Sequence, residues 1–267
     1  MDSIDIFKKT IYDYYQDNRR DFIWRRDPTP YQVVVSEIML QQTQTARVVA
    51  KYTQFITELP SFQALAAATT RQVLVLWQGL GYNRRGLALH DLAKQVVEQY
   101  GGVLPSDPEL LQKFKGIGPA TAGSICAFAF NKPTVFIETN IRSVFIHAFF
   151  KDKEQVHDKE LLPLVEAALD KNNSREWYYA LTDYGVMLKK TCKNPARKSA
   201  HHQVQSKFEG SNRQIRGLIL KLLAEHFSLT QEQIIAYIPR DQNKIIKNLE
   251  ILSQEKIIKE RDSIYYL

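Results

Sequence analysis

Apolar residues recur at helical spacing along most of the chain, and this pattern predicts a mainly α-helical protein. In the stretch 36–55 they fall close to one helical face, at Ile38, Leu40, Ala46, Val49 and Phe55. Similar patterns predict helices over 62–77, 86–100, 109–115, 120–130, 141–150, 159–169 and 175–188. Asp107 before Pro108, and Ser174, are interpreted as helix caps. Alternation typical of strands is scarce before residue 255, and the β-branched run 134–137 is interpreted as a loop crossing the core.

A polar stretch at 199–211, interpreted as a linker, precedes a second pattern. Helical periodicity over 213–227, 230–238 and 241–254 is followed by two short β-like pieces, 256–260 and 263–267. Three helices followed by a hairpin form the outline of a winged helix. A helical cap on the first domain is the alternative. We therefore expect a first domain over 1–198, a linker over 199–211 and a winged-helix-like DNA-binding domain over 212–267.

Length and composition narrow the class of protein. A chain of 267 residues with 44% apolar residues is large enough for a real hydrophobic core. No run of eighteen uncharged apolar residues occurs, and residues 1–20 are polar and charged, which argues against a membrane span or a secretory signal. The two cysteines, Cys126 and Cys192, suffice for neither a disulfide scaffold nor a cysteine metal site. We expect a reducing cytosolic setting.

The formal net charge of +7 is unevenly distributed, because basic residues cluster in two segments of the sequence. The stretch 189–216 holds eight lysines and arginines and one acid, Glu209. A second group brackets Trp24 and consists of Arg19, Arg20, Arg25 and Arg26. Such segments suit a polyanion, because neutralising a phosphate releases condensed counterions. A solvated basic surface explains the same charges equally well.

The segment 111–123 reads as helix, tight turn and helix, with Gly116, Ile117 and Gly118 in the turn. Glycines allow the backbone to approach a ligand closely, and the first N–H groups of the following helix lack partners within that helix. These donors, together with the positive end of the helix dipole, favour a phosphate. The pattern indicates a helix-hairpin-helix grip on a DNA backbone, with an ordinary helix–helix turn as the alternative.

Two acidic residues, Glu37 and Glu138, lie within apolar stretches. Buried acids are costly unless they are hydrogen-bonded or functional. Two carboxyls with separated pKa values suit the cleavage of a nucleoside bond, since one protonates the leaving base while the other stabilises an oxocarbenium-like sugar. From the residues alone, a buried structural ion pair explains each acid at least as well.

Four motifs occur in order between about residues 20 and 188: SEIMLQQTQ (36–44), WQGLGYNRR (77–85), FKGIGPATAG (114–123) and the acid-X-Asn-X-Arg string at 138–142. Together they resemble the helix-hairpin-helix DNA glycosylases of the endonuclease III superfamily, and most closely the MutY-type mismatch-adenine branch. The resemblance covers roughly two-thirds of the chain. It implies a two-lobed helical glycosylase fold.

The resemblance also implies roles for matching residues. Glu37 would protonate the departing adenine, Glu138 would stabilise the sugar cation and Asn140 would hold Glu138 in place. Gln42 would wedge into the base stack, and Tyr82 would intercalate beside the partner base. The residues expected to contact DNA are Gln41, Gln42, Tyr82, Lys115, Gly116, Gly118, Thr121 and Arg142. Those expected to line the base pocket and its entrance are Arg20, Trp24, Leu40 and Ala120.

The sequence departs from the family pattern at several places. Glu138 replaces an aspartate, and a shift of about 1 Å near a reacting centre can cost roughly a hundredfold in rate. Ala120 stands where bifunctional lyases have a lysine, so we expect a monofunctional enzyme. Only Cys192 lies where the family has four cluster cysteines, so we predict no iron–sulfur cluster and no other cofactor or metal.

The C-terminal region is the fourth departure, because it is too short and too helical to resemble the family's domain for reading 8-oxoguanine. A winged helix would grip DNA instead, with a helix in the major groove and the wing on the backbone. The expected reading helix, 241–254, carries Asn243, Lys244, Lys247 and Asn248.

We therefore predict a base-excision-repair glycosylase that removes adenine opposite guanine or 8-oxoguanine. Thymine or uracil opposite guanine, or another damaged base, are the alternative substrates. A non-catalytic mismatch sensor is the alternative of another class. The predicted partner is double-stranded DNA with a mismatch or damaged base, and we expect a monomer located in the cytoplasm at the nucleoid.

Overall fold

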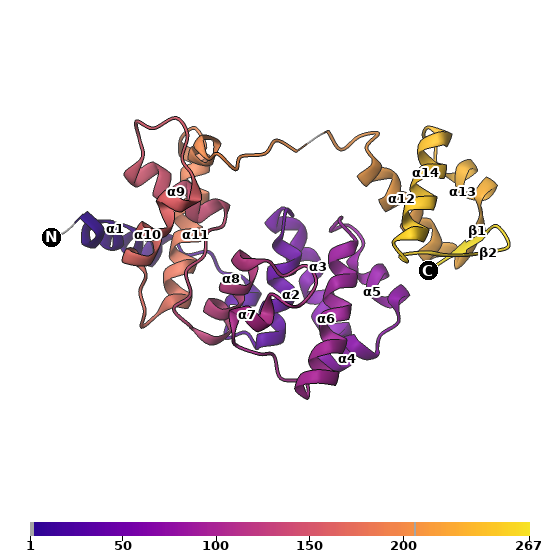
Figure 1. Cartoon of the computed structure of the whole chain (residues 1–267), viewed down its shortest axis with the longest axis horizontal. Coiled ribbons are helices and arrows are strands. Elements are labelled where there is room, and N and C mark those ends of the chain that lie inside the picture. Colours follow the sequence, from indigo (N-terminus) through magenta and orange to yellow (C-terminus); the bar gives the residue numbers. More distant parts are fainter. Residues whose placement is uncertain (1–2, 206) are drawn as a thin grey trace. The chain divides into compact units, whose positions relative to one another are not determined.

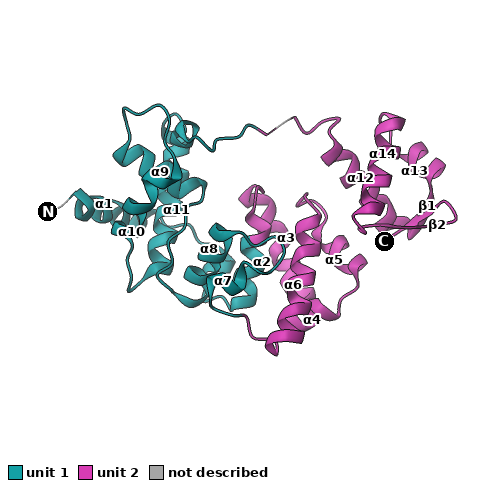
Figure 2. Ribbon diagram, viewed as in Figure 1, with its two compact units in different colours: residues 1–37, 105–204 teal, residues 38–104, 205–267 magenta. Residues whose placement is uncertain are grey.

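The computed structural model describes residues 3–205 and 207–267, and its secondary structure is mainly helical, as predicted (Figure 1). The chain forms two compact units, one from residues 1–37 and 105–204 and the other from residues 38–104 and 205–267 (Figure 2). The predicted domain boundaries at 198 and 212 stay a prediction. Ser206, within the predicted linker, lies outside the described residues. No described helix has the length and apolar character needed to cross a membrane.

The described residues of the first unit form helices joined by loops, with one isolated β-bridge between Val156 and Ser199. Its elements are α1 (Ser3–Asn18), η1 (Ile23–Arg25), most of α2 (Pro30–Leu40), α7 (Pro108–Leu111), α8 (Pro119–Phe130), α9 (Thr139–Phe149), α10 (Asp158–Ala168), α11 (Ser174–Thr191) and η2 (Pro195–Lys198). Helix α11 is central, because it packs against α1, α8 and α9.

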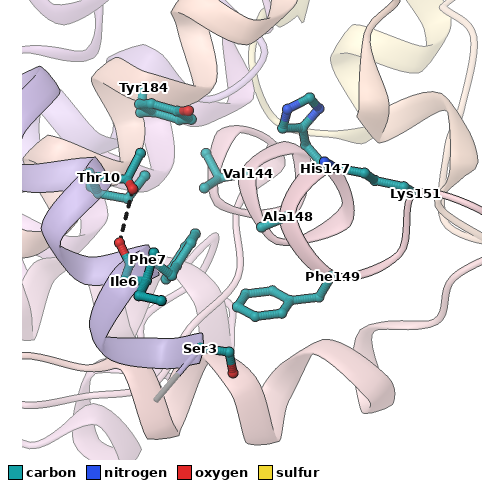
Figure 3. Close-up of a pocket in the computed structure, with 11 residues that line it drawn as sticks. Ser3, Ile6, Phe7, Thr10, Val144, His147, Ala148, Phe149, Lys151 and Tyr184 are labelled. Atoms are coloured by element: carbon teal, nitrogen blue, oxygen red, sulfur yellow. Dashed lines mark hydrogen bonds between the residues drawn. The ribbon is translucent and has the colours of Figure 1, made fainter. Parts of the chain in front are cut away.

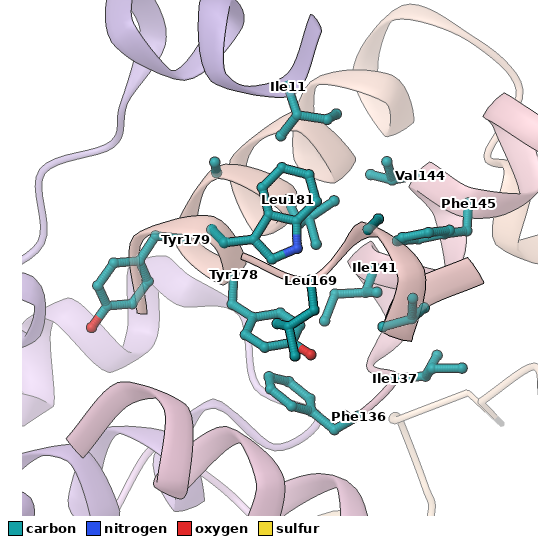
Figure 4. Packing of buried hydrophobic residues seen from close by; sticks show 14 of the residues in the cluster. Ile11, Phe136, Ile137, Ile141, Val144, Phe145, Leu169, Tyr178, Tyr179 and Leu181 are labelled. Atoms are coloured by element: carbon teal, nitrogen blue, oxygen red, sulfur yellow. The ribbon is translucent and has the colours of Figure 1, made fainter. Parts of the chain in front are cut away.

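Aromatic side chains fill the core of the first unit (Figure 4). Trp177 and Tyr178 of α11 are fully buried, and the ring of Phe136 packs 4.1 Å from that of Tyr178. Helix α1 was not predicted, although it buries one face through Phe7, Ile11 and Tyr15. Charged residues between these positions mask the helical pattern in a scan for apolar runs.

The run 134–137 forms neither helix nor strand, which confirms the predicted loop. Its Phe136 and Ile137 are buried, so this loop does enter the core. The Asp107 cap is also confirmed, since its carboxylate accepts from the N–H groups of Glu109 and Leu110. The Ser174 cap is wrong: Asn173 holds the capping position, and the Ser174 hydroxyl donates to the carbonyl of Asp170.

Two of the predicted long helices are each broken into two shorter helices. The stretch 36–55 belongs to α2 and α3 (Thr45–Glu58), separated by a turn in which Gln42 has φ +51°. The stretch 62–77 splits into α4 (Phe62–Ala67) and α5 (Thr70–Trp77), because Thr69 forms a capping box with Gln72. Helix α6 (Arg84–Tyr100) then packs against both α4 and α5.

The C-terminal part of the second unit has three helices and a small sheet, which agrees with the predicted outline of a winged helix. Its elements are α12 (Asn212–His226), β1 (Ser228–Thr230), α13 (Gln231–Tyr237), α14 (Gln242–Gln254), β2 (Lys259–Arg261) and β3 (Ile264–Tyr266). The strands are antiparallel in the order β1-β3-β2, and β1 was not predicted. Asp262 and Ser263, both at positive φ, turn the chain between β2 and β3.

Helix α12 packs against α5. Leu74 of α5 is buried within the C-terminal apolar core. The guanidinium of Arg71, one turn earlier, donates to the carbonyls of Leu223 and Ala224 at the end of α12. These contacts attach the C-terminal helices to α5 through both apolar and polar groups.

Candidate active site

Glu37 lies in α2 among buried residues, and its carboxyl meets the hydroxyl of Ser124 on α8 with an O–O distance of 2.5 Å. Burial raises the pKa of Glu37 to about 7, and the negative charge of Glu138 adds to this rise. The Ser124 hydrogen bond and the positive charge of Arg25 act in the opposite direction. At neutral pH, Glu37 therefore exists in both its protonated and its ionised form.

The surroundings of Ser124 also accommodate a protonated Glu37. Ser124 Oγ lies 2.5 Å from Glu37 Oε2 and 3.0 Å from the carbonyl oxygen of Thr121. A hydroxyl carries one proton, so it donates to only one of these oxygens at a time. Both hydrogen bonds exist together when Glu37 is protonated and donates to Ser124.

Glu138 caps the N-terminus of α9. Its Oε1 accepts hydrogen bonds from the backbone N–H groups of Asn140 (2.8 Å) and Ile141 (2.9 Å). Its Oε2 accepts from the side-chain amide of Asn140 at 3.2 Å. These donors and the positive end of the helix dipole suit a carboxylate.

Lys189 of α11 holds Asn140 from the other side, with Nζ 2.8 Å from Asn140 Oδ1. Burial lowers the pKa of Lys189, while the charge of Glu138 acts in the opposite direction. Gly185, one turn earlier on α11, allows this close approach, since a Cβ there would lie 2.6 Å from the carbonyl oxygen of Asn140. Sequence reasoning missed Lys189 and Ser124, because nothing in their local pattern marks them as partners of the two acids.

The first unit thus brings the two predicted catalytic acids within electrostatic range of each other. Glu37 sits in an apolar setting that favours its proton, whereas Glu138 is surrounded by N–H donors. In such a pair, the protonated carboxyl suits a general acid and the ionised carboxylate suits the stabilisation of a positive charge.

Arg20, predicted at the base pocket, pairs with a buried carboxylate, that of Asp183. Asp183 of α11 accepts from Arg20 Nε at 2.7 Å and from both terminal nitrogens of Arg25 at 2.9 Å. Trp24 stacks on Phe22 with ring centroids 4.7 Å apart. Asp183 was missed, and Arg25, which the sequence indicated only as part of a basic group, pairs with it inside the protein. Together they fix the conformation of the segment that carries Arg20.

The predicted hairpin forms between α7 and α8. Gly116 has φ +86°, in the region that favours glycine, and the N–H of Ile117 donates to the carbonyl of Phe114. Gly118 caps α8, and a Cβ added there would meet nothing within 4 Å. Lys115 and Thr121, predicted to contact DNA, and Ala120, predicted to line the base pocket, are exposed or partly exposed. The start of α8 is therefore open to a ligand.

Arg142 is engaged within the protein. Its Nε and Nη2 each lie 2.7 Å from an oxygen of Asp158, a bidentate ion pair in which the Arg142 side chain is 15% exposed. Its predicted role in DNA binding stays a prediction.

The second unit contains Leu40, Gln41, Gln42 and Tyr82, whereas both acids belong to the first unit. Gln42 (φ +51°) and Tyr82 (φ +46°) both have left-handed backbone conformations. Arg85 organises the two loops that carry them. Its guanidinium donates to backbone carbonyls of both segments, namely those of Ile38, Met39, Gln41, Leu80 and Gly81. This role of Arg85 was also missed.

The residues of the first unit do not fit an iron–sulfur cluster. Cys192 ends α11, and its thiol meets the carbonyl of Leu188 at 3.0 Å. The other cysteine, Cys126, is buried in α8, and burial raises its pKa to about 11. Two cysteines, one of them buried and protonated, cannot supply four thiolates.

A cavity of about 450 Å³ lies between α1 and α9 in the first unit (Figure 3). Its lining includes Phe7, Val144 and Phe149 and none of the predicted site residues. It carries no arrangement of groups suited to the chemistry above.

The chain is similar in sequence and in fold to known DNA repair proteins. A model of the HhH-GPD superfamily of base excision DNA repair proteins matches residues 35–166. An adenine DNA glycosylase of Mycolicibacterium smegmatis is 30% identical over 234 residues, which cover 80% of this chain and 79% of that protein. An adenine DNA glycosylase of Rattus norvegicus is 40% identical over 144 residues, which cover 51% of this chain and only 28% of the rat protein. The structure of a thermostable thymine-DNA glycosylase shares the fold, with a TM-score of 0.65 at 23% identity over 72% of this chain and 90% of that one.

Proposed function

The chain belongs to the HhH-GPD superfamily of base excision DNA repair proteins, and from this premise we propose that it is a DNA glycosylase that removes a mismatched adenine from duplex DNA. The adenine opposite guanine or 8-oxoguanine is the proposed substrate. The relatives named adenine DNA glycosylases support this choice of base. Action as a monomer at the nucleoid is part of the proposal.

The observation that carries the proposal is the pair of unlike acids in the first unit. Glu37, with a pKa of about 7, donates its proton to the leaving base. Glu138, held by Asn140 and the start of α9, stabilises the positive charge that develops on the sugar while water attacks. Lys189 keeps the Asn140 amide turned toward Glu138.

The glycosylase is proposed to be monofunctional and to work without an iron–sulfur cluster. Ala120 offers no amine for a Schiff base where a lyase needs one. The two cysteines do not provide the ligands of a cluster. Strand cleavage that depends on added alkali, and iron analysis of the purified protein, test these two points.

A single-turnover excision screen tests the proposal. The labelled duplexes carry adenine opposite guanine or 8-oxoguanine, thymine or uracil opposite guanine, and hypoxanthine. We expect abasic sites only in the adenine duplexes. Release of a different base would support the proposed mechanism but would change the assigned substrate. Tight binding without product from any duplex would identify a mismatch sensor instead.

The variants Glu37→Gln and Glu138→Gln test the two catalytic roles. Each is expected to abolish excision and to leave duplex binding nearly unchanged. Glutamine has nearly the same size as glutamate, but it carries neither a negative charge nor an acidic proton. A fully active Glu138→Gln variant would show that the assigned role of Glu138 is wrong.

A further inference from the structure

The second unit contains a cavity of about 610 Å³, and the starts of the helices α6 and α12 form much of its wall. Four of its described lining residues are arginines: Arg84, Arg85, Arg213 and Arg216. The described lining includes no acidic residue. A concave surface lined by charges of one sign concentrates ions of the opposite sign, so this cavity favours an anionic ligand. Its volume lies in the range of sites for small ligands.

Three of the four arginines reach solvent and can meet a ligand. Arg84 is exposed, and Arg213 and Arg216 are partly exposed. We refer to these three residues as the arginine cluster. The fourth, Arg85, already donates to backbone carbonyls of two loops, so it is not counted among the groups that bind a ligand.

The carboxylate of Glu255, directly after α14, lies between two members of the arginine cluster. It accepts hydrogen bonds from Arg84 Nε at 2.9 Å and from Arg216 Nη1 at 3.2 Å. One carboxylate balances only one of these two positive charges, and the ion pairs of the described residues give neither arginine a second acid. The pair of arginines therefore keeps an excess positive charge, and Glu255 shows that an oxyanion fits between them.

The start of α12 adds a second source of positive potential at the cavity. This helix has 15 residues and begins at Asn212, which lines the cavity together with Arg213. The first N–H groups of a helix have no partners within the helix, and the helix dipole is positive at this end. Both effects favour an anion, in the same direction as the charges of the arginine cluster.

Gly217 of α12 leaves the cavity open. A glycine inside a helix is destabilising relative to alanine, so its presence there needs a reason. Close packing is not the reason, because a Cβ added to Gly217 would meet nothing within 4 Å. The residue is exposed and lines the cavity. Its missing side chain therefore leaves room for a ligand beside the arginine cluster.

Helix α14 offers less to a ligand than its sequence indicated. Asn248, one of the residues expected to read a DNA groove, is only 1% exposed, and its amide donates to the carbonyl of Lys244 at 2.7 Å. The helix contributes Ile251 to the wall of the cavity. The charged groups that line the cavity thus come from α6 and α12.

We propose that this cavity binds a phosphate group, which the arginine cluster and the start of α12 hold. Guanidinium groups bind phosphate oxygens through paired N–H donors, and such contacts read no base. The phosphate comes either from the backbone of a DNA strand or from a free nucleotide or inorganic phosphate. The site does not depend on the proposed base excision, because its groups are separate from the two acids.

Two measurements on the full chain test the site and separate the sources of phosphate. The first is the dissociation constant for a fully paired duplex as a function of KCl concentration, which needs no excision. Each lost phosphate contact lowers the slope of log K against log salt by about 0.9. The second is the melting temperature in inorganic phosphate or ATP, compared with chloride at the same ionic strength, since a ligand that binds the folded state raises it.

Three variants change the site in different ways. Arg84→Met removes an exposed cation, Gly217→Leu fills the cavity without a change of charge, and Glu255→Gln removes the competing carboxylate. Lys221→Met is the matched control, because Lys221 is an exposed cation of α12 that does not line the cavity.

Arg84→Met and Gly217→Leu are expected to weaken phosphate binding, and Glu255→Gln is expected to strengthen it. For a backbone phosphate, the loss of one contact corresponds to about eightfold weaker duplex binding at 0.1 M KCl, from the change of about 0.9 in slope. The gain in Glu255→Gln cannot result from misfolding. Lys221→Met is expected to match wild type in both measurements.

The outcomes distinguish the two sources from failure of the inference. A smaller salt slope in Arg84→Met and Gly217→Leu assigns the phosphate to the DNA backbone. An unchanged slope, with stabilisation by inorganic phosphate or ATP that both variants lose, assigns it to a free ligand. The inference is overturned if neither measurement separates these variants from Lys221→Met, or if Glu255→Gln binds more weakly than wild type in both. Absence of base excision would contradict the proposed function and would leave these results unaffected.

Discussion

Glu37 is the residue whose setting has the clearest measurable consequence. Burial raises its folded-state pKa from 4.5 to about 7, so the folded protein binds a proton that the unfolded chain has released. Between about pH 4.5 and pH 7 the stability of the wild type therefore falls as the pH rises, and above pH 7 the cost stays constant.

Glu37→Gln is expected to remove this pH dependence. Relative to wild type, the variant gains free energy of unfolding between pH 5 and pH 8, by about 3 kcal/mol at most, from 1.36 kcal/mol per pKa unit. Urea unfolding of both proteins at the two pH values measures this gain. An equal difference at pH 5 and pH 8 would show that Glu37 titrates normally.

At the residue level, the sequence indicated the acids but not their partners. Glu37 and Glu138 stand out because each interrupts an apolar run. Ser124 and Lys189 lie 87 and 49 residues from the groups they contact, so only the fold brings them there. The pairing of Arg142 with Asp158, sixteen residues away, was hidden for the same reason.

The helix-hairpin-helix element separates two uses of glycine. Gly116 has φ +86°, which a residue with a Cβ adopts only at a cost, whereas Gly118 has φ −88° and open space around it. Gly116 thus serves the fold of the turn, and Gly118 leaves room for whatever approaches the start of α8.

This difference predicts opposite effects for two alanine variants. Gly116→Ala is expected to lower the free energy of unfolding by about 1–2 kcal/mol. Gly118→Ala is expected to leave stability within about 0.5 kcal/mol of wild type and to weaken duplex binding, because its methyl group blocks the close approach of a phosphate. Denaturant titration and a salt-dependent binding assay measure both effects, and wild-type affinity in Gly118→Ala would contradict the phosphate site.

Among the elements, most helices were predicted but some of their ends were not. Apolar periodicity continues across the breaks at 41–44 and 68–69, so it does not reveal that Gln42 turns left-handed or that Thr69 caps a new helix. Strand β1 has three residues, too few for a period-two pattern to be visible. The hairpin at the C-terminus was found because its two β-like pieces flank a polar turn.

On the scale of the whole molecule, the C-terminal helices share an apolar core with a helix from another part of the chain. Leu74 of α5 is buried in that core, while its neighbour Val75 is 40% exposed. Folding of the C-terminal part is therefore coupled to α5.

Leu74→Ala is expected to lower the free energy of unfolding by about 2–5 kcal/mol through the cavity it leaves. Val75→Ala on the same helix is the control and is expected to change it by less than about 0.5 kcal/mol. Calorimetry of the full chain measures both variants. Equal melting temperatures would show that Leu74 contributes nothing to this core.

The position of Arg85 affects how any mutational survey of this protein is interpreted. A lysine there has no planar fork and cannot serve so many carbonyls at once, so even the conservative exchange should collapse the two loops. A deep mutational scan that measures DNA repair in living cells would then find substitutions of Arg85 as poorly tolerated as those of Glu37. Such data alone would suggest that Arg85 is a catalytic residue, although its role is to hold two loops in place by donating hydrogen bonds to their backbone carbonyls.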